Sequence, residues 1–297
     1  MLTVGSRGSA LALWQARWAV SRLEALGEAA RIEIVHTTGD RVLDVSLAKV
    51  GTKGMFTKEI EEALLAGAID IAVHSLKDMP TELPGCLTLA AIPEREDARD
   101  CVVGALTEGA RAGTSSLRRA AQLRALRPDL EIVDIRGNVD TRLRKLDEGR
   151  YDAILLAAAG LNRLGLRGRI AEYLEPERMC PAVGQGALAI ETRDDGGRAQ
   201  GLAASLDHPS TRAAVTAERA LLAALGGGCQ VPAGAYAHID NGVLHLRAIA
   251  ASPDGLRVIR TSVSGDPADA ESLGRQAGGE LLAQGAREIL EAVYGRP

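Results

Sequence analysis

The chain has 297 residues, of which 46% are hydrophobic and 25% are charged, a balance typical of globular domains and not of disordered segments. A chain of this length suits two or three domains. Its net charge of −4 and its aromatic content of 2% argue against a general nucleic-acid binder, because such proteins present basic surfaces and aromatic rings that stack on bases.

The N-terminal stretch MLTVGSRGSALALWQARWAV does not fit a signal peptide, because Arg7, Gln15 and Arg17 interrupt its apolar part. The longest weakly polar run, residues 153–161, is too short to span a bilayer. The four cysteines are widely spaced and match neither a zinc-binding nor a redox pattern. We therefore expect a cytoplasmic protein with reduced thiols and no bound metal.

The first third of the chain alternates between strand and helix patterns. Strands are expected at residues 2–6, 31–37, 69–75 and 88–92, and helices at 9–26 and 56–67. The hydroxyl of Ser9 is placed to cap the first helix. The charged stretch PEREDARD, residues 93–100, is expected to be a connector.

The second third repeats this alternation. Strands are expected at 100–104, 131–135, 151–157 and 187–192, helices at 116–126 and 138–148, and a second connector at PAVGQG, residues 181–186. Because strands alternate with helices, we expect parallel sheets with helical crossovers.

The last hundred residues follow a different pattern. A helix at 210–225 ends at three glycines, and three strands follow at 233–239, 242–252 and 256–264. A long helix is expected from 267 to 293. This order predicts a small α+β domain.

Several familiar catalytic motifs are absent from the sequence. It contains no HExxH, no GxSxG, no GxGxxG that opens a helix after a strand, and no Walker loop, since GTKGMFTKE lacks the Gly-Lys-Ser/Thr ending. Metal-dependent hydrolysis and nucleotide hydrolysis are therefore disfavoured.

Arginines gather in the middle of this acidic chain. Residues 111–150 contain nine Arg and one Lys against six Asp or Glu, a local balance of +4 that suggests a focused site for small anions. In GTSSLRR, Arg118 and Arg119 stand in the first turns of a helix, where the helix dipole disfavours cations. A bound anion would resolve this conflict. The alternative is that Thr114 and its neighbouring serines are a redundant helix cap.

Four further arginines follow or begin predicted elements. Arg136 stands at the carboxyl end of a strand, where α/β sheets bind ligands, and Arg142 lies six residues on. Arg163 also follows a strand. Arg7, in GSRGSALALWQ, lies at a helix start that attracts anions, although a plain capped helix with a surface arginine explains that motif too.

The stretch IDIAVHSLKDMP carries the strongest chemical signal. A buried strand leads directly into Lys77 and Asp78, and an aspartate beside cations can stabilise a cationic intermediate or shuttle a proton. A solvated turn is the alternative interpretation. His74 is expected to support the turn, because nothing pairs it with a nucleophile.

Cys229 follows three glycines and precedes Gln-Val-Pro. A glycine that ends the preceding helix would explain one of the three glycines. A loop that presents the thiol for attachment or catalysis would explain all of them. Both interpretations remain open from the residues alone.

Together these stretches closely resemble the porphobilinogen deaminase family, also called the hydroxymethylbilane synthase family. The matching pieces in chain order are GSRGSALALWQ, LAKVGTKGMFTKE, DIAVHSLKDMP, GTSSLRR, RGNVDTRL, AAAGLNRL, PAVGQGAL and GGGCQVP. They extend from residue 5 to residue 232, and GTSSLRR with GGGCQVP in one chain is a highly specific combination. Two departures are small: Ser6 stands where Thr is common, and Asp140 where Asn or Gly is usual.

The resemblance implies two α/β lobes like those of a periplasmic binding protein, with a hinge, and a small C-terminal α+β domain of a three-stranded sheet with helices. The implied domains are residues 1–94 with 187–206, residues 95–186, and residues 207–297. A monomer is expected, with no membrane or nucleic-acid partner.

The resemblance also implies the reaction. Four porphobilinogen molecules would condense stepwise onto a dipyrromethane cofactor with release of ammonia, and hydrolysis would release hydroxymethylbilane for haem synthesis. Cys229 would carry the cofactor through a thioether, and Asp78 would be the principal catalytic residue. Lys49 and Phe56 would belong to an active-site loop. The residues implied to bind cofactor and substrate are Arg7, Ser9, Lys53, Ser75, Lys77, Thr114, Ser115, Arg118, Arg119, Arg136, Arg142, Arg163 and Gln185.

The competing class is a non-catalytic, two-lobed binding protein for a small carboxylate ligand. It would account for the arginines and the hinge, but not for Lys77 and Asp78 or for Cys229. A generic lyase acting on amino substrates is a third interpretation.

Overall fold

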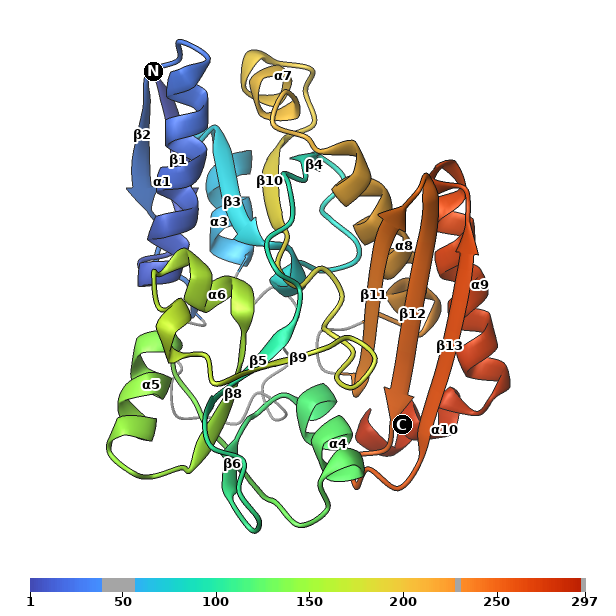
Figure 1. The fold of residues 1–297 in the computed structure, drawn as a ribbon. Coiled ribbons are helices and arrows are strands. Elements are labelled where there is room, and N and C mark those ends of the chain that lie inside the picture. The colour runs from blue at the N-terminus through green and yellow to red at the C-terminus, as the bar shows by residue number, and fades with distance from the viewer. Residues whose placement is uncertain (39–56, 228–230, 295–297) are drawn as a thin grey trace. The chain divides into compact units, whose positions relative to one another are not determined.

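A computed structural model describes residues 1–38, 57–227 and 231–294. The predicted site residues Lys49, Lys53, Phe56 and Cys229 lie outside the described residues. The chain forms two compact units, Met1–Glu96 with Ala187–Arg212, and Asp97–Gly186 with Ala213–Pro297. Figure 1 labels most of the helices and strands of the two units, which are described one at a time.

The first unit contains a five-stranded sheet in the order β2-β1-β3-β10-β4. Its strands are β1 (Leu2–Ser6), β2 (Ala30–Ile34), β3 (Ile71–Ser75), β4 (Leu87–Ala91) and β10 (Leu188–Arg193). β1 is parallel to β2 and β3, but β10 is antiparallel to β3 and β4. The prediction of a wholly parallel sheet is therefore wrong. No helical crossover joins β10 to its neighbours, since the chain reaches it from the second unit.

Three helices of the first unit are α1 (Ala10–Ala25), α3 (Lys58–Leu65) and α7 (Arg198–Ala204). The predicted cap is confirmed, because the Ser9 hydroxyl accepts a hydrogen bond from the Ala12 amide at the start of α1. Ala16 and Leu23 of α1 pack in a core with Val73 of β3, which anchors the helix on the sheet.

The second unit contains another five-stranded sheet, in the order β7-β6-β8-β5-β9. Its strands are β5 (Asp100–Gly104), β6 (Arg111–Gly113), β7 (Glu131–Val133), β8 (Ala153–Ala157) and β9 (Glu172–Leu174), with helices α4 (Leu117–Leu126), α5 (Val139–Asp147) and α6 (Ala158–Arg163). β5 is antiparallel to β8 and β9, so this sheet is also mixed. The short strands β6 and β9 were not expected, because three residues carry too little periodicity to be recognised.

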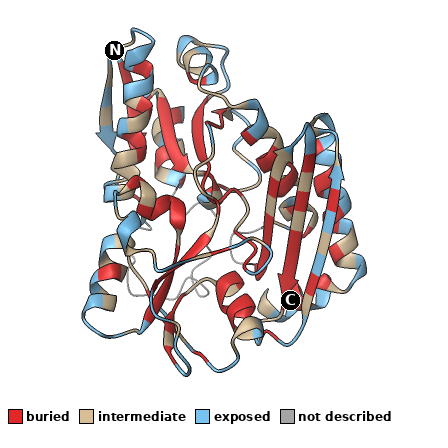
Figure 2. Cartoon of the chain, viewed as in Figure 1, coloured by how far each residue is buried: buried red, intermediate tan, exposed pale blue. Residues whose placement is uncertain are grey.

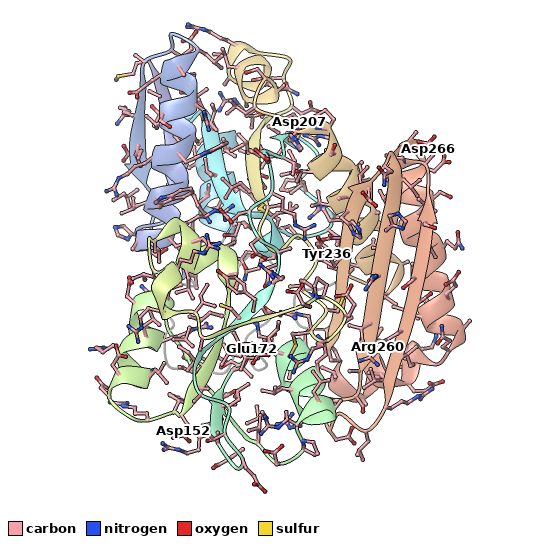
Figure 3. The ribbon with its side chains drawn as sticks, in the orientation of Figure 1. Asp152, Glu172, Asp207, Tyr236, Arg260 and Asp266 are labelled. Carbon is pink, nitrogen blue, oxygen red and sulfur yellow. The ribbon has the colours of Figure 1, made fainter. Side chains whose placement is uncertain are left out.

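The C-terminal part of the second unit is an antiparallel sheet in the order β11-β12-β13. It comprises β11 (Ala233–Asp240), β12 (Val243–Ala251) and β13 (Val258–Gly265), with helices α8 (Pro209–Ala224), α9 (Ala270–Ala283) and α10 (Ala286–Tyr294). Alternate residues of the strands, such as Ala235 and Leu246, join the helices in one core. Figure 2 shows the buried residues along β11 and β12. Tyr236 and Arg260, labelled in Figure 3, project from the other face.

The expected single helix at 267–293 is wrong. A short turn, Pro267–Asp269, precedes α9, and α9 ends at Ala283, with Gln284 as its C-cap, before Gly285 takes a φ of 94°. That backbone conformation favours glycine and stops the helix. α9 also depends on a small residue at Gly274, where a Cβ would lie 2.2 Å from the Ala217 carbonyl oxygen of α8.

Two mixed α/β sheets and a three-stranded antiparallel sheet with helices confirm the expected fold class. Within the described residues, none of the helices has the length and apolar character needed to span a membrane. The three domain boundaries and the hinge stay predictions.

Candidate cofactor and substrate site

A pocket of about 80 Å³ opens in the first unit where β1 and β3 end and α1 begins. The carboxyl ends of these parallel strands meet at one edge of the sheet, which is where α/β sheets bind ligands. The polar residues that line the pocket are Arg7, Ser9, Gln15, Thr57, His74, Ser75 and Asp78. Four of these residues were predicted from the sequence as site residues: Arg7, Ser9, Ser75 and Asp78.

The turn after β3 presents Asp78. Leu76–Asp78 forms one turn of 3-10 helix, in which Leu76 is buried, Lys77 is half-buried and Asp78 is exposed. The buried leucine anchors the turn while the two charged residues stay accessible. Ser75 is fixed from α1, because the Gln15 side-chain amide donates to its hydroxyl at 2.8 Å.

Beneath this turn lies a buried acid–base pair. The His74 ring nitrogen Nε2 lies 3.1 Å from a carboxyl oxygen of Glu191 on β10, and Glu191 is fully buried. Glu61 of α3 is close by, and burial raises the pKa of its carboxyl, as does the charge of Glu191. His74 therefore belongs to the interior of the sheet while it also lines the pocket.

In the second unit, the Ser/Thr cluster forms the turn before α4. The Thr114 hydroxyl accepts from the Ser116 amide at 3.2 Å, and Ser116 caps α4. Ser115 donates to the Ile135 carbonyl at 2.7 Å and accepts from the Ile135 amide at 3.1 Å. These bonds tie the start of α4 to the end of β7, and each hydroxyl has a different task. The redundant-cap interpretation is therefore wrong.

Arg118 and Arg119 are buried and share the carboxylate of Asp100. Burial alone would raise the pKa of the Asp100 carboxyl, but the two guanidinium charges outweigh it and hold that pKa well below its usual range. The sequence predicted an anion beside Arg118 and Arg119. The Asp100 carboxylate is one such anion, and it belongs to the protein itself.

Two of the remaining predicted arginines donate side-chain hydrogen bonds to the backbone. Arg142 donates to the Gly137 carbonyl at 2.7 Å, and Arg163 donates to that of Gly186 at 2.7 Å. Arg136 is half-buried, and its carbonyl accepts from Lys145 at 3.0 Å. Gln185 is fully buried and donates to Asp100 at 2.9 Å.

Two of the described cysteines are poor nucleophiles. Burial raises the pKa of the Cys101 and Cys180 thiols to about 12, so neither forms the reactive thiolate near neutral pH. Cys86 is exposed. The described residues contain no cluster of three or more metal-ligating side chains.

The sequence did not nominate Gln15, Asp100 or Glu191 as site residues. Gln15 is the last residue of the GSRGSALALWQ motif, so the motif itself carried a signal. Asp100 and Glu191 are acidic residues within buried strands, which is unusual unless the charge is paired. That pattern was the available signal for both.

The chain matches two family profiles. Residues 2–200 match "Porphobilinogen deaminase, dipyromethane cofactor binding domain", and residues 212–283 match "Porphobilinogen deaminase, C-terminal domain". The first of these profiles identifies a cofactor-binding domain of the dipyrromethane type. The porphobilinogen deaminase of Syntrophobacter fumaroxidans is 53% identical, over 99% of this chain and 98% of that protein. That of Pelobacter propionicus is 54% identical with the same coverage. The chain belongs to the porphobilinogen deaminase family.

Solved structures with similar folds include two binding proteins. A periplasmic substrate-binding protein of an ABC transporter from Coxiella burnetii is 16% identical with a TM-score of 0.44, over 74% of this chain and 97% of that one. The methionine binding protein MetQ is 13% identical, also with a TM-score of 0.44, over 69% of this chain and 89% of that one.

The described residues fit a polycarboxylate cofactor. Arg118 and Arg119 together carry one more positive charge than Asp100 can balance. Within the first unit, taken by itself, Arg7 and Ser9 provide a cation and a hydroxyl at the pocket. Donors of this kind bind carboxylates, and arginine does so through a planar pair of N–H groups.

Proposed function

We propose that the chain is a transferase of tetrapyrrole synthesis (hydroxymethylbilane synthase, EC 2.5.1.61) that condenses four porphobilinogen molecules head to tail, releases ammonia at each addition, and hydrolyses the product to hydroxymethylbilane. Family membership supports the reaction. The observation that supports the site is the pocket in which Asp78 stands beside Arg7, Ser9 and Ser75.

The proposed cofactor is dipyrromethane, held covalently by a thioether to Cys229. When bound, it supplies the pyrrole carbon from which the product is extended. The protonated state of the buried Cys101 and Cys180 thiols supports this choice of cysteine, because both are disfavoured as attachment sites.

The carboxylate of Asp78 is the proposed catalytic group. A pyrrole ring gains positive charge as ammonia leaves porphobilinogen, and an adjacent carboxylate stabilises that charge and can accept the proton that the ring later loses. Its exposure at the pocket supports access to substrate. Lys77, from the same turn, is proposed to bind a substrate carboxylate.

The other proposed binding residues divide by unit. Arg7, Ser9 and Ser75 belong to the first unit, and Lys53 lies outside the described residues. The set proposed in the second unit is Thr114, Ser115, Arg118, Arg119, Arg136, Arg142, Arg163 and Gln185. Lys49 and Phe56 are proposed for a loop over the active site.

The three-domain division, a monomeric state and a cytoplasmic location are proposed with this function. The separate hydrophobic cores of the β5–β9 sheet and of the β11–β13 sheet support two domains within the second unit.

The intact mass of the purified chain under denaturing conditions tests the function. The expected result is an excess equal to two linked pyrrole units, which is lost in Cys229→Ser and kept in the control Cys86→Ser. A chain at its bare mass that neither gains mass nor releases ammonia with porphobilinogen would overturn the proposal. Binding of porphobilinogen without ammonia release would favour the non-catalytic binding protein.

A further inference from the structure

Asp100, the first residue of β5, holds two arginines of another element. Its carboxylate accepts from Nη1 of Arg118 at 2.6 Å and from Nε of Arg119 at 2.9 Å. Gln185 donates to the same carboxylate at 2.9 Å. Because Asp100 is fully buried, water does not screen these contacts.

The other recorded partners of the two guanidinium groups are neutral. Arg118 donates to the Cys180 carbonyl at 2.6 Å, and Arg119 donates to the Leu155 carbonyl at 3.1 Å. Each guanidinium is therefore oriented by Asp100 and by the backbone of a second segment. This dual support fixes the planes of both groups, and the planes determine how arginine meets a carboxylate.

The charges at this cluster do not balance. Two guanidinium groups, exposed by 4% and 6%, face one carboxylate. Buried charges are costly unless they are paired, so one carboxylate stabilises the pair and an excess positive charge persists. A ligand carboxylate would neutralise that excess.

We propose that Asp100 is a positioning residue for cofactor binding. It fixes Arg118 and Arg119 before any ligand arrives, and it leaves the excess charge that the carboxylates of dipyrromethane neutralise. This inference rests on the proposed function, in which both arginines bind the cofactor.

The test follows the covalent loading of full-length chain produced without cofactor, in a host that cannot make porphobilinogen. Loading is measured as the gain in intact mass during incubation with porphobilinogen, below the thermal midpoint of every variant. Asp100→Asn is expected to load roughly 10–100-fold more slowly than the parent, because the amide removes the charge and misplaces both guanidinium groups.

Asp97→Asn is the matched control. Asp97 lies three residues earlier and pairs with Arg99 at 2.7 Å, so its loss also breaks an Asp–Arg pair but leaves Arg118 and Arg119 in place. It is expected to load at the parent's rate. A folded Asp100→Asn chain that loads as fast as Asp97→Asn would overturn the inference.

If Asp100→Asn alone does not fold, the inference is tested with a charge-balanced double variant, Asp100→Asn with Arg119→Gln. It removes one charge of each sign. If the folded double variant loads more slowly than Arg119→Gln alone, the inference is supported, because Arg118 has then lost its carboxylate partner. Loading as fast as Arg119→Gln alone overturns it. A parent chain that gains no mass would overturn the proposed function, and this inference with it.

Discussion

His74 of β3 and Glu191 of β10 pair inside the sheet of the first unit, 3.1 Å apart and both buried. The pair lies between antiparallel strands, and the next residue after His74 is Ser75, which lines the pocket. One contact thus contributes both to the stability of the sheet and to the position of a proposed binding residue.

We expect His74→Phe to destabilise the first unit by about 3 kcal/mol, because it leaves a buried carboxyl group without its imidazole partner. The double variant with Glu191→Leu should recover part of this loss. Both tryptophans, Trp14 and Trp18, lie in α1 of this unit, so urea denaturation followed by tryptophan fluorescence reports on it. Equal losses in the single and double variants would contradict the pairing.

The buried carboxyl group of Glu61 is expected to make the stability of the first unit depend on pH. Burial raises the pKa of its carboxyl, so the folded chain holds this proton more tightly than the unfolded chain. The group therefore costs stability above its unfolded pKa of about 4.5, and the cost disappears as pH falls below that value. Glu61→Gln should raise the urea midpoint at pH 7.5 and leave it unchanged near pH 4.

The neighbouring Glu62 provides a control for that measurement. It is exposed and pairs with Lys58 at 3.9 Å, so Glu62→Gln is expected to change stability by less than about 0.5 kcal/mol at either pH. A Glu61→Gln chain that is less stable than the parent at pH 7.5 would contradict the assigned direction.

Local patterns in the sequence predict most of the elements but not their pairing. The start of α1 follows from Ser9 and the apolar spacing that comes after it, because both signals lie within a few residues. The antiparallel direction of β10 cannot be read in this way, since it depends on where the chain returns from the second unit. The glycine at position 285 was a sequence signal for the break between α9 and α10. The apolar pattern continues across it, however, and therefore favoured a single helix.

The candidate site shows the same division. Two adjacent arginines at the start of α4 indicate that an anion is needed. That Asp100, 18 residues away, supplies a carboxylate depends on the packing of α4 against β5. Sequence thus predicts the chemistry of the cluster, and only the fold identifies the partner.

His238 of β11 is expected to make the C-terminal sheet less stable at acidic pH. Its ring stacks on that of His245, with ring centroids 5.3 Å apart. Burial lowers the pKa of His238, and His245 and Arg247 lower it further, while Asp240 and Glu177 oppose them. Because the unfolded chain then binds this proton more readily, stability falls as pH drops through about 6.5 towards the lower folded value.

His238→Gln should reduce the loss of thermal stability between pH 7.5 and pH 5, measured by circular dichroism. The exposed His36 provides the matched control, because His36→Gln should leave the loss as it is in the parent. If both variants lost as much stability as the parent, His238 would not be the sensitive group.

Glu218 of α8 connects the second connector to the C-terminal sheet. Its two carboxyl oxygens accept from the amides of Gly184 and Ala237, each at 2.7 Å, and the side chain is fully buried. Glu218→Ala leaves both amides without this acceptor and should cost about 3 kcal/mol. Thermal denaturation followed by circular dichroism measures the loss. Glu288→Ala, which removes an exposed pair with Arg257, should cost less than about 1 kcal/mol, and equal losses would contradict this role for Glu218.

A substitution at Asp78 is expected to lower activity without lowering stability. The side chain of Asp78 is exposed, whereas Leu76 anchors the same turn in the core. Asp78→Asn keeps the size of the side chain and removes its charge. We expect kcat to fall by roughly 10²–10⁴-fold, since a neutral amide neither stabilises a cationic pyrrole nor accepts its proton. The thermal midpoint should stay within about 1 °C of the parent's, as for most exposed substitutions.

Glu82→Gln is the control for Asp78, because Glu82 is an exposed carboxylate four residues further along the same segment. It should retain the parent's rate of ammonia release from porphobilinogen. Should Asp78→Asn also retain that rate, the catalytic role would pass to another group. A large loss of thermal stability in Asp78→Asn would instead show that this carboxylate supports the turn.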